Sequence, residues 1–184
     1  HFGQVGVSLL TVYTMWIAIV RLQQHPMIGV LVGLVAALLA TVFLAWLSFR
    51  LEPDGLGVMS IAVHLAALAV VLNWQSVTRG ALGIPSIPRF SFIAGNGSFA
   101  VFTIAIALCW IFFVWRLDRS SFGRALTALS EHPWYAESLG IHRRRVHFTS
   151  FVIAAVGTLL SNILFPQYLY LLSPTDYMFP GMVF

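Results

Sequence analysis

The sequence predicts an all-α membrane protein, a polytopic bundle of about five transmembrane helices that carries one long charged loop. The first observation is composition: the 184 residues are 59% hydrophobic and 9% charged, whereas soluble domains carry about 25% charged residues. A lipid bilayer explains this excess of apolar residues and a water-soluble core does not. The apolar residues also form five separate segments, and most charges gather between residues 116 and 148.

The five apolar segments are residues 2–20, 27–49, 55–78, 98–115 and 148–165. A helix needs about 20 residues to cross the hydrocarbon core. Backbone groups in lipid must bond within their own segment, so helix is the expected state of each. Histidine and asparagine interrupt the third segment, which could therefore cross the membrane or dip in and return. Pro166 follows the fifth segment directly and is expected to end its helix.

The distribution of arginine predicts the orientation. The positive charge is carried by arginine alone, because the sequence contains no lysine. With five crossings, seven arginines lie in loops on one side and three on the other, and arginine-rich loops are typically cytoplasmic. We therefore expect residues 116–147 to form a cytoplasmic loop, and we interpret the basic balance as membrane orientation rather than nucleic-acid binding.

Two further features concern the ends and the opposite side. Residues 79–97 are rich in glycine and proline, so we expect an irregular loop, with Asn96-Gly97-Ser98 forming a turn before the next helix. The chain begins at His1 without methionine and ends on apolar residues. These ends indicate one partial transmembrane domain over residues 1–184, truncated at both ends.

The charged loop has the features of two short amphipathic helices. Ser121 is expected to cap a first helix over residues 122–129, which places Phe122, Ala125, Leu126 and Leu129 on one face. Pro133 suits the start of a second helix and Gly140 suits its C-terminal end. Large apolar side chains in a solvated loop favour a partner surface.

This loop resembles the cytoplasmic loop of the branched-chain amino-acid ABC-transporter permeases. The family's segment begins Ser-x-Phe-Gly-Arg-Ala-Leu, continues with an acidic residue and ends Ala-Glu-x-Leu-Gly-Ile. The matching positions here are Ser120 or Ser121, Phe122, Gly123, Arg124, Ala125, Leu126, Glu131, Ala136, Glu137, Leu139, Gly140 and Ile141. Weaker similarities in the family's order cover most of the chain. In residues 78–88, which resemble an outer-loop motif, Arg79 stands where the family usually has glycine.

The resemblance implies a multi-pass subunit of the bacterial inner membrane that moves branched-chain or related small amino acids. It implies no cofactor on this chain, because ATP and Mg would be bound by separate ABC ATPase subunits. The usual ATP-binding P-loop needs a lysine, and none is present. A related second permease subunit and a periplasmic substrate-binding protein are the other implied partners, besides membrane lipid. Phe122, Leu126 and Leu129 would contact the ATPase, while Arg124, Glu131 and Glu137 would set the register by charge pairing.

The substrate path is predicted from interruptions in the spans. Broken helices point backbone groups at a ligand in many transporters, and the candidate positions are Gly3, Gly6, Gly57, His64 and Asn73. The polar side chains among them, and Asn162 in the fifth segment, are more often interhelical hydrogen-bonding groups.

Several alternatives stay open. Urea and short amides travel through similar permeases, so the cargo could be one of these. An ion-coupled carrier usually has Asp or Glu inside a span, and here His64 is the one strongly titratable candidate. A structural membrane protein is a further alternative. Enzyme activity is not expected, because the His-Glu-x-x-His and Gly-x-Ser-x-Gly motifs are absent. The spacing of His132, His142 and His147 suits no metal site, and none is expected.

Overall fold

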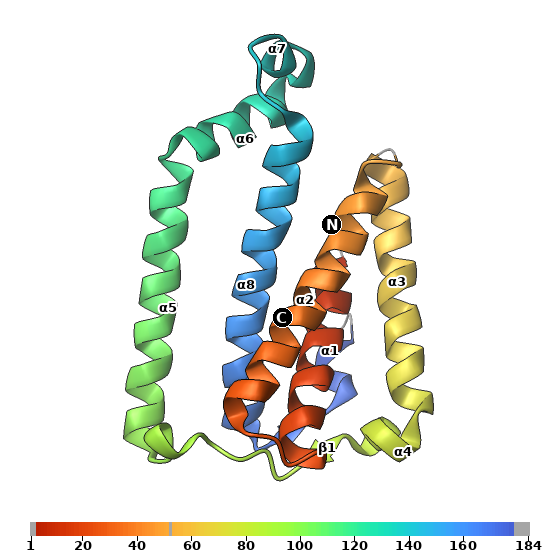
Figure 1. The fold of residues 1–184 in the computed structure, drawn as a ribbon, viewed down its shortest axis with the longest axis vertical. Helices are drawn as coiled ribbons and strands as arrows, with labels where there is room; N and C mark the ends of the chain where they lie inside the picture. Colours follow the sequence, from red (N-terminus) through yellow and green to blue (C-terminus); the bar gives the residue numbers. More distant parts are fainter. Residues whose placement is uncertain (1–2, 52, 179–184) are drawn as a thin grey trace.

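The computed structural model describes residues 3–51 and 53–178, and this part of the chain is an all-α bundle (Figure 1). Five helices are long and apolar enough to cross a membrane. They are α1 (Gly3–Trp16), which a π-helical turn η1 (Ile17–Arg21) prolongs, α2 (Pro26–Ser48), α3 (Pro53–Asn73), α5 (Asn96–Asp118) and α8 (Arg143–Leu169). The predicted fold class is therefore confirmed.

The chain crosses the bundle from end to end with each long helix (Figure 1). One end holds the C-terminal end of α2 and the start of α3, together with α6 (Ser121–Glu131) and α7 (Pro133–Ser138), and we call it the arginine-rich end (Figure 1). The other, the β end, holds α4 (Gln75–Thr78), β1 (Ile84–Pro85) and β2 (Leu171–Leu172). Helix α3 runs from the first end of the bundle to the second, so the third segment does not turn back within the bundle. Its helix stops at Asn73, short of the predicted Thr78, because α4 is a separate turn after Trp74.

Helix α1 lies at the centre of the bundle and packs against α2, α3 and α8. Its contacts with α8 are partly polar, because the Gln4 side-chain amide donates to the Ala154 carbonyl at 3.0 Å and to the Thr158 hydroxyl. The α3 face is equally close, since a Cβ added to Gly6 would lie 3.2 Å from the His64 Cα. Small and polar residues of this kind let helix backbones approach each other inside a membrane.

Pro166 does not end the fifth span, and the prediction that it would is wrong: α8 continues through it to Leu169. Proline has no backbone N–H, so the carbonyl of Asn162, four residues earlier, loses its helical donor. The Trp16 indole N–H of α1 donates to that carbonyl at 3.2 Å. A neighbouring helix thus supplies the missing hydrogen bond, which is how a proline is tolerated inside a membrane helix.

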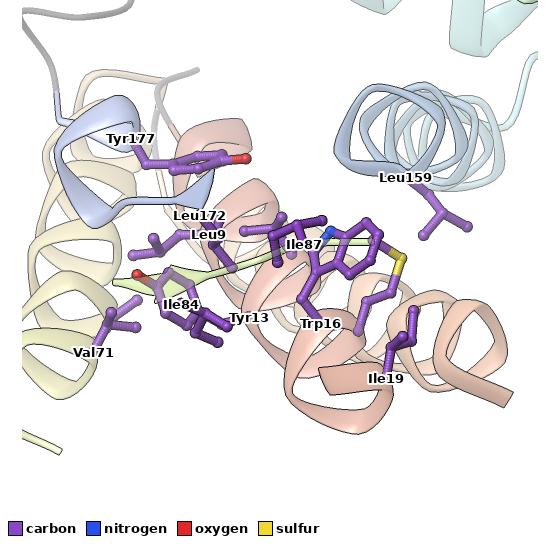
Figure 2. Close-up of a cluster of buried hydrophobic side chains, with 13 residues drawn as sticks. Leu9, Tyr13, Trp16, Ile19, Val71, Ile84, Ile87, Leu159, Leu172 and Tyr177 are labelled. Atoms are coloured by element: carbon purple, nitrogen blue, oxygen red, sulfur yellow. The ribbon is translucent and has the colours of Figure 1, made fainter. Parts of the chain in front are cut away.

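A hydrophobic cluster closes the β end around Trp16 and Leu9 (Figure 2). Ile84 and Ile87 of the loop after α4 pack into it with Leu172 and Tyr177 of the C-terminal segment. The loop predicted to be irregular is mostly 3₁₀ turns and coil, although β1 pairs with β2 antiparallel. Gly83 has φ +67°, and a Cβ there would lie 2.1 Å from the Leu172 carbonyl oxygen, so only glycine fits this close approach.

Helix α5 stands at the edge of the bundle, with most of its large apolar side chains exposed. Its contact with α8 depends on Trp110, whose ring lies over Gly157, where an added Cβ would come within 2.6 Å of the indole. Asn96, Gly97 and Ser98 form its first turn after a Gly95 N-cap. The turn predicted at these residues is therefore wrong by a few positions.

Candidate functional site

The candidate site is the loop from α6 to α7, which stands on the arginine-rich end between α5 and α8 (Figure 1). It begins with a sharp corner after α5. The Ser120 hydroxyl accepts from the backbone N–H groups of Phe122 at 3.1 Å and Gly123 at 3.4 Å, so Ser120 caps α6. The prediction that Ser121 is the cap is wrong by one residue, since Ser121 is already the first helical residue.

Gly123 fixes the angle of this corner. A Cβ at this position would lie 2.0 Å from the carbonyl oxygen of Asp118, the last residue of α5. Only glycine therefore lets α6 turn away so closely from the end of α5. The glycine of the loop motif has a structural role that its sequence context alone did not reveal.

Helices α6 and α7 form a small hairpin that buries part of its own apolar surface. Leu129 of α6 is 4% exposed and Ala136 of α7 is also buried. Pro133 starts α7 as predicted. Gly140 ends it with φ +84°, donating its N–H to the Glu137 carbonyl at 3.0 Å, which is the left-handed helix end that glycine favours.

The apolar residues that this hairpin exposes lie mostly on α7. Trp134, Tyr135 and Leu139 are 85%, 73% and 81% exposed. Of the four residues predicted to share one apolar face of α6, Phe122 and Ala125 are half-buried, Leu126 is exposed, and Leu129 faces inward. The free apolar surface is therefore at α7, and the sequence feature that could have indicated it is the bulky pair Trp134-Tyr135.

The loop also carries exposed charge of both signs. Glu131 and Glu137 are exposed, and within the described residues neither forms an ion pair. Arg124 donates to the Arg119 carbonyl at 3.2 Å, which ties α6 to the end of α5. Three further arginines, Arg143, Arg144 and Arg145, form the first turn of α8. An acidic pair beside an apolar tip, with arginines behind it, suits a partner with a mixed surface.

A cavity of about 570 Å³ separates α6 from the ends of the spans. Leu126 lines it from the loop side, Ser48 and Gly57 line it from α2 and α3, and Ser150 and Phe151 line it from α8. Because one wall belongs to the loop and the others to three spans, a shift of α6 changes the cavity directly.

The five predicted substrate-path residues do not form one site. Gly3 and Gly6 lie buried on α1, with Gly6 against the fully buried His64 of α3. Gly57 lines the cavity beside α6. Asn73 lies at the β end and donates to the Ala69 carbonyl of its own helix at 2.8 Å. The structure brings Gly6 and His64 together and leaves Gly57 and Asn73 near opposite ends.

The fold and the loop together define a class: a multi-pass membrane protein whose spans carry a compact, exposed hairpin of helices at one end. The profile of the family described as "Branched-chain amino acid transport system / permease component" matches residues 1–184. The chain belongs to this family of membrane permeases.

One relative gives the scale of the match. The chain is 27% identical over 179 residues to the high-affinity branched-chain amino acid transport system permease protein LivM of Escherichia coli strain K12. The match covers 83% of this chain and 42% of LivM, so the chain spans less than half the length of that relative. No solved structure matches the chain significantly.

Proposed function

We propose that the chain is part of the transmembrane subunit of an ABC importer, which moves branched-chain or related small amino acids across the bacterial inner membrane. ATP hydrolysis would take place on separate ATPase subunits in the cytoplasm. A related second permease subunit and a periplasmic substrate-binding protein would complete the assembly. Family membership and the similarity to LivM support the cargo class and the partners.

The observation that carries the proposal is the exposed tip of α7 on a rigid base. Trp134, Tyr135 and Leu139 present apolar area to solvent, and aromatic residues dominate the energetics of protein interfaces. The corner at Ser120 and Gly123 and the turn at Gly140 hold this tip in one position. A partner that moves the tip would move α8 with it, because only the four residues from Leu139 to His142 separate the end of α7 from the start of α8.

The ATPase interface is tested by Trp134→Ala in the complete permease complex. We expect the mutant to lose co-purification with the ATPase subunits by about 30-fold, the effect of removing an interface residue worth about 2 kcal/mol. Trp74→Ala is the matched control, because Trp74 is also exposed but lies at the β end. Equal co-purification of Trp134→Ala and wild type, with Trp134 labelled from the periplasm, would contradict the proposal.

Coupling and cargo need separate measurements. Glu137→Arg and Gly140→Trp should abolish uptake while ATP hydrolysis continues and the complex stays inserted. Uptake of radiolabelled leucine by cells that depend on this permease tests the cargo, with urea as the competing substrate. Saturable uptake of urea without leucine would place the cargo in the amide class instead.

A further inference from the structure

Arg89 occupies an unusual position at the β end, between the start of α5 and the last turn of α8. Its guanidinium donates to the Asn96 side-chain oxygen at 2.6 Å and to the Gln167 carbonyl at 3.4 Å. The same group lies over two aromatic rings, 4.6 Å from the centroid of Phe99 and 4.7 Å from that of Tyr170. These contacts fix the guanidinium in place.

This fixed positive charge has no counter-ion among the described residues. Among the described residues, every partner of Arg89 is a neutral oxygen or an aromatic ring, and Arg89 takes part in no further interaction there. Guanidinium groups bind carboxylate and phosphate through paired N–H donors. A held, half-buried arginine without an acid is therefore suited to an anion from outside the chain.

A cavity of about 500 Å³ opens beside Arg89 and runs along α5. Asn96, Phe99, Thr103 and Ile104 of α5 form one wall and Tyr168 the other. The Thr103 hydroxyl is buried without a hydrogen-bond partner in the described structure. The cavity is thus charged at the β end and mainly apolar towards the middle of the span.

The length of the cavity decides which anion fits. Asn96 and Ile104 are eight residues apart on one helix, which is about 12 Å at 1.5 Å per residue. A single amino acid is too short to reach from Arg89 to Ile104, whereas a phospholipid places its phosphate at the membrane boundary and its acyl chain along the span. The aromatic side chains at the mouth, Tyr168 and Tyr170, are the type enriched at that boundary.

We propose that this cavity binds one anionic phospholipid, with its phosphate on Arg89 and an acyl chain against Phe99, Ala100 and Ile104. The inference does not rest on the transported substrate or on the ATPase partners. It assigns to α5, the span with the fewest contacts to the rest of the bundle, a lipid that bridges it to the end of α8.

The test measures phosphatidylglycerol bound to the purified, complete permease by native mass spectrometry. Arg89→Gln removes the charge, and Ala100→Phe fills the cavity without touching the charge. Ala105→Phe is the matched control, since Ala105 is exposed on α5 away from the cavity. We expect Arg89→Gln to lower retention roughly fivefold, the effect of about 1 kcal/mol per basic residue near anionic lipid. Ala100→Phe should lower retention at least as much, and Ala105→Phe should leave it near the wild-type value.

Three results would overturn the proposal. One is equal lipid retention by the wild type, Arg89→Gln and Ala100→Phe. Another is equal thermal protection of the permease by inorganic phosphate and by phosphatidylglycerol, which would mean that a free anion is the ligand. The third is loss of subunit assembly in Ala100→Phe with lipid retention unchanged, which would mean that protein covers the cavity.

Discussion

Helices α1 and α5 are both apolar spans of the same bundle, yet they occupy opposite environments. In the most apolar stretch of α1 and η1, 61% of the residues are buried inside the structure, whereas only 6% are buried in the corresponding stretch of α5. Helix α1 carries Gln4, Ser8 and Thr11 among its apolar residues, and Gln4 and Ser8 bond to α8. In a membrane, polar side chains mark the faces that meet protein, because lipid is as apolar as leucine.

The comparison is tested most strongly by two tryptophans, Trp16 on α1 and Trp115 on α5. Trp16→Ala should lower the free energy of unfolding by about 3–5 kcal/mol, because it leaves a cavity in a packed core. Trp115→Ala should cost less than about 1 kcal/mol, because Trp115 is half exposed and contacts mainly Phe112 and Arg119. Titrating the protein in mild detergent with a denaturing detergent measures both changes in the free energy of unfolding. Similar losses would remove the distinction between the two spans.

Trp16→Phe separates the two roles of the indole. The ring volume is largely kept, but the Asn162 carbonyl that Pro166 leaves without a donor would have no partner. We expect a loss of about 1–3 kcal/mol, the desolvation penalty of a buried unsatisfied group. The double variant with Pro166→Ala should regain most of it, because alanine restores the helical N–H. A Trp16→Phe variant as stable as the wild type would contradict the hydrogen-bond role.

Gly157→Val breaks the contact on which the packing of α5 depends. The added side chain would meet the Trp110 ring, and overpacking of this kind costs about 1–3 kcal/mol. The bundle of α1, α2 and α3 should stay intact, so the change should appear as a shift of α5 alone. Disulfide crosslinking between cysteines placed on α5 and α8 measures it, with crosslinking between α1 and α2 as the control.

The polar link between α1 and α8 gives a smaller expected effect. The Ser8 hydroxyl donates to the Asn162 side-chain oxygen at 2.9 Å, and the Asn162 amide donates to the Ser8 carbonyl at 3.0 Å. A double-mutant cycle of Ser8→Ala with Asn162→Ala should give a coupling of about 0.6–1.7 kcal/mol, the range measured for hydrogen bonds between membrane helices. A coupling of zero would mean that the hydrogen bond between the Ser8 and Asn162 side chains does not stabilise the contact between these helices.

The smallest expected effect depends on pH and concerns Asp176, which lies in the C-terminal segment that packs against α1. Burial raises the pKa of the Asp176 carboxyl above its usual value of 3.8. The folded state then binds this proton more tightly than the unfolded state does. Protonation of Asp176 therefore stabilises the folded state most below pH 3.8, and this stabilisation is lost as pH rises through the raised pKa. Asp176→Asn should therefore stabilise the protein at neutral pH by roughly a few tenths of a kcal/mol. The effect is small because water screens most of the charge of this partly exposed carboxyl. An equal gain at pH 3 would contradict this explanation.

The spans and the charged loop were predictable because both depend on local composition. A run of about 20 apolar residues has few other stable states, and Pro133 and Gly140 mark the ends of α7 from their backbone preferences. The inward position of Leu129 was not predictable, since it depends on α7 folding back over α6. Whether the helix continues through Pro166 was not predictable either, because it depends on a hydrogen bond from Trp16, which lies 150 residues earlier in the chain.

Arg79 shows how a local departure becomes understandable in the structure. It stands where the resembling family usually has glycine, and its φ of +65° and ψ of 13° place it in the left-handed region at the end of α4. Glycine adopts this conformation without steric cost, whereas other residues do so at a cost of about 1–2 kcal/mol. The sequence indicated the unusual residue, but its backbone angle came only with the fold.

The bond between Trp16 and Asn162 divides α8 into two arms of unequal length. The helix has 27 residues, and Asn162 lies about 28 Å from its start and about 10 Å from its end at 1.5 Å per residue. If this bond acts as the fulcrum, a displacement of about 3 Å beside α7 becomes about 1 Å, in the opposite direction, beside β2. Such a lever exchanges distance for force between the two ends of the helix.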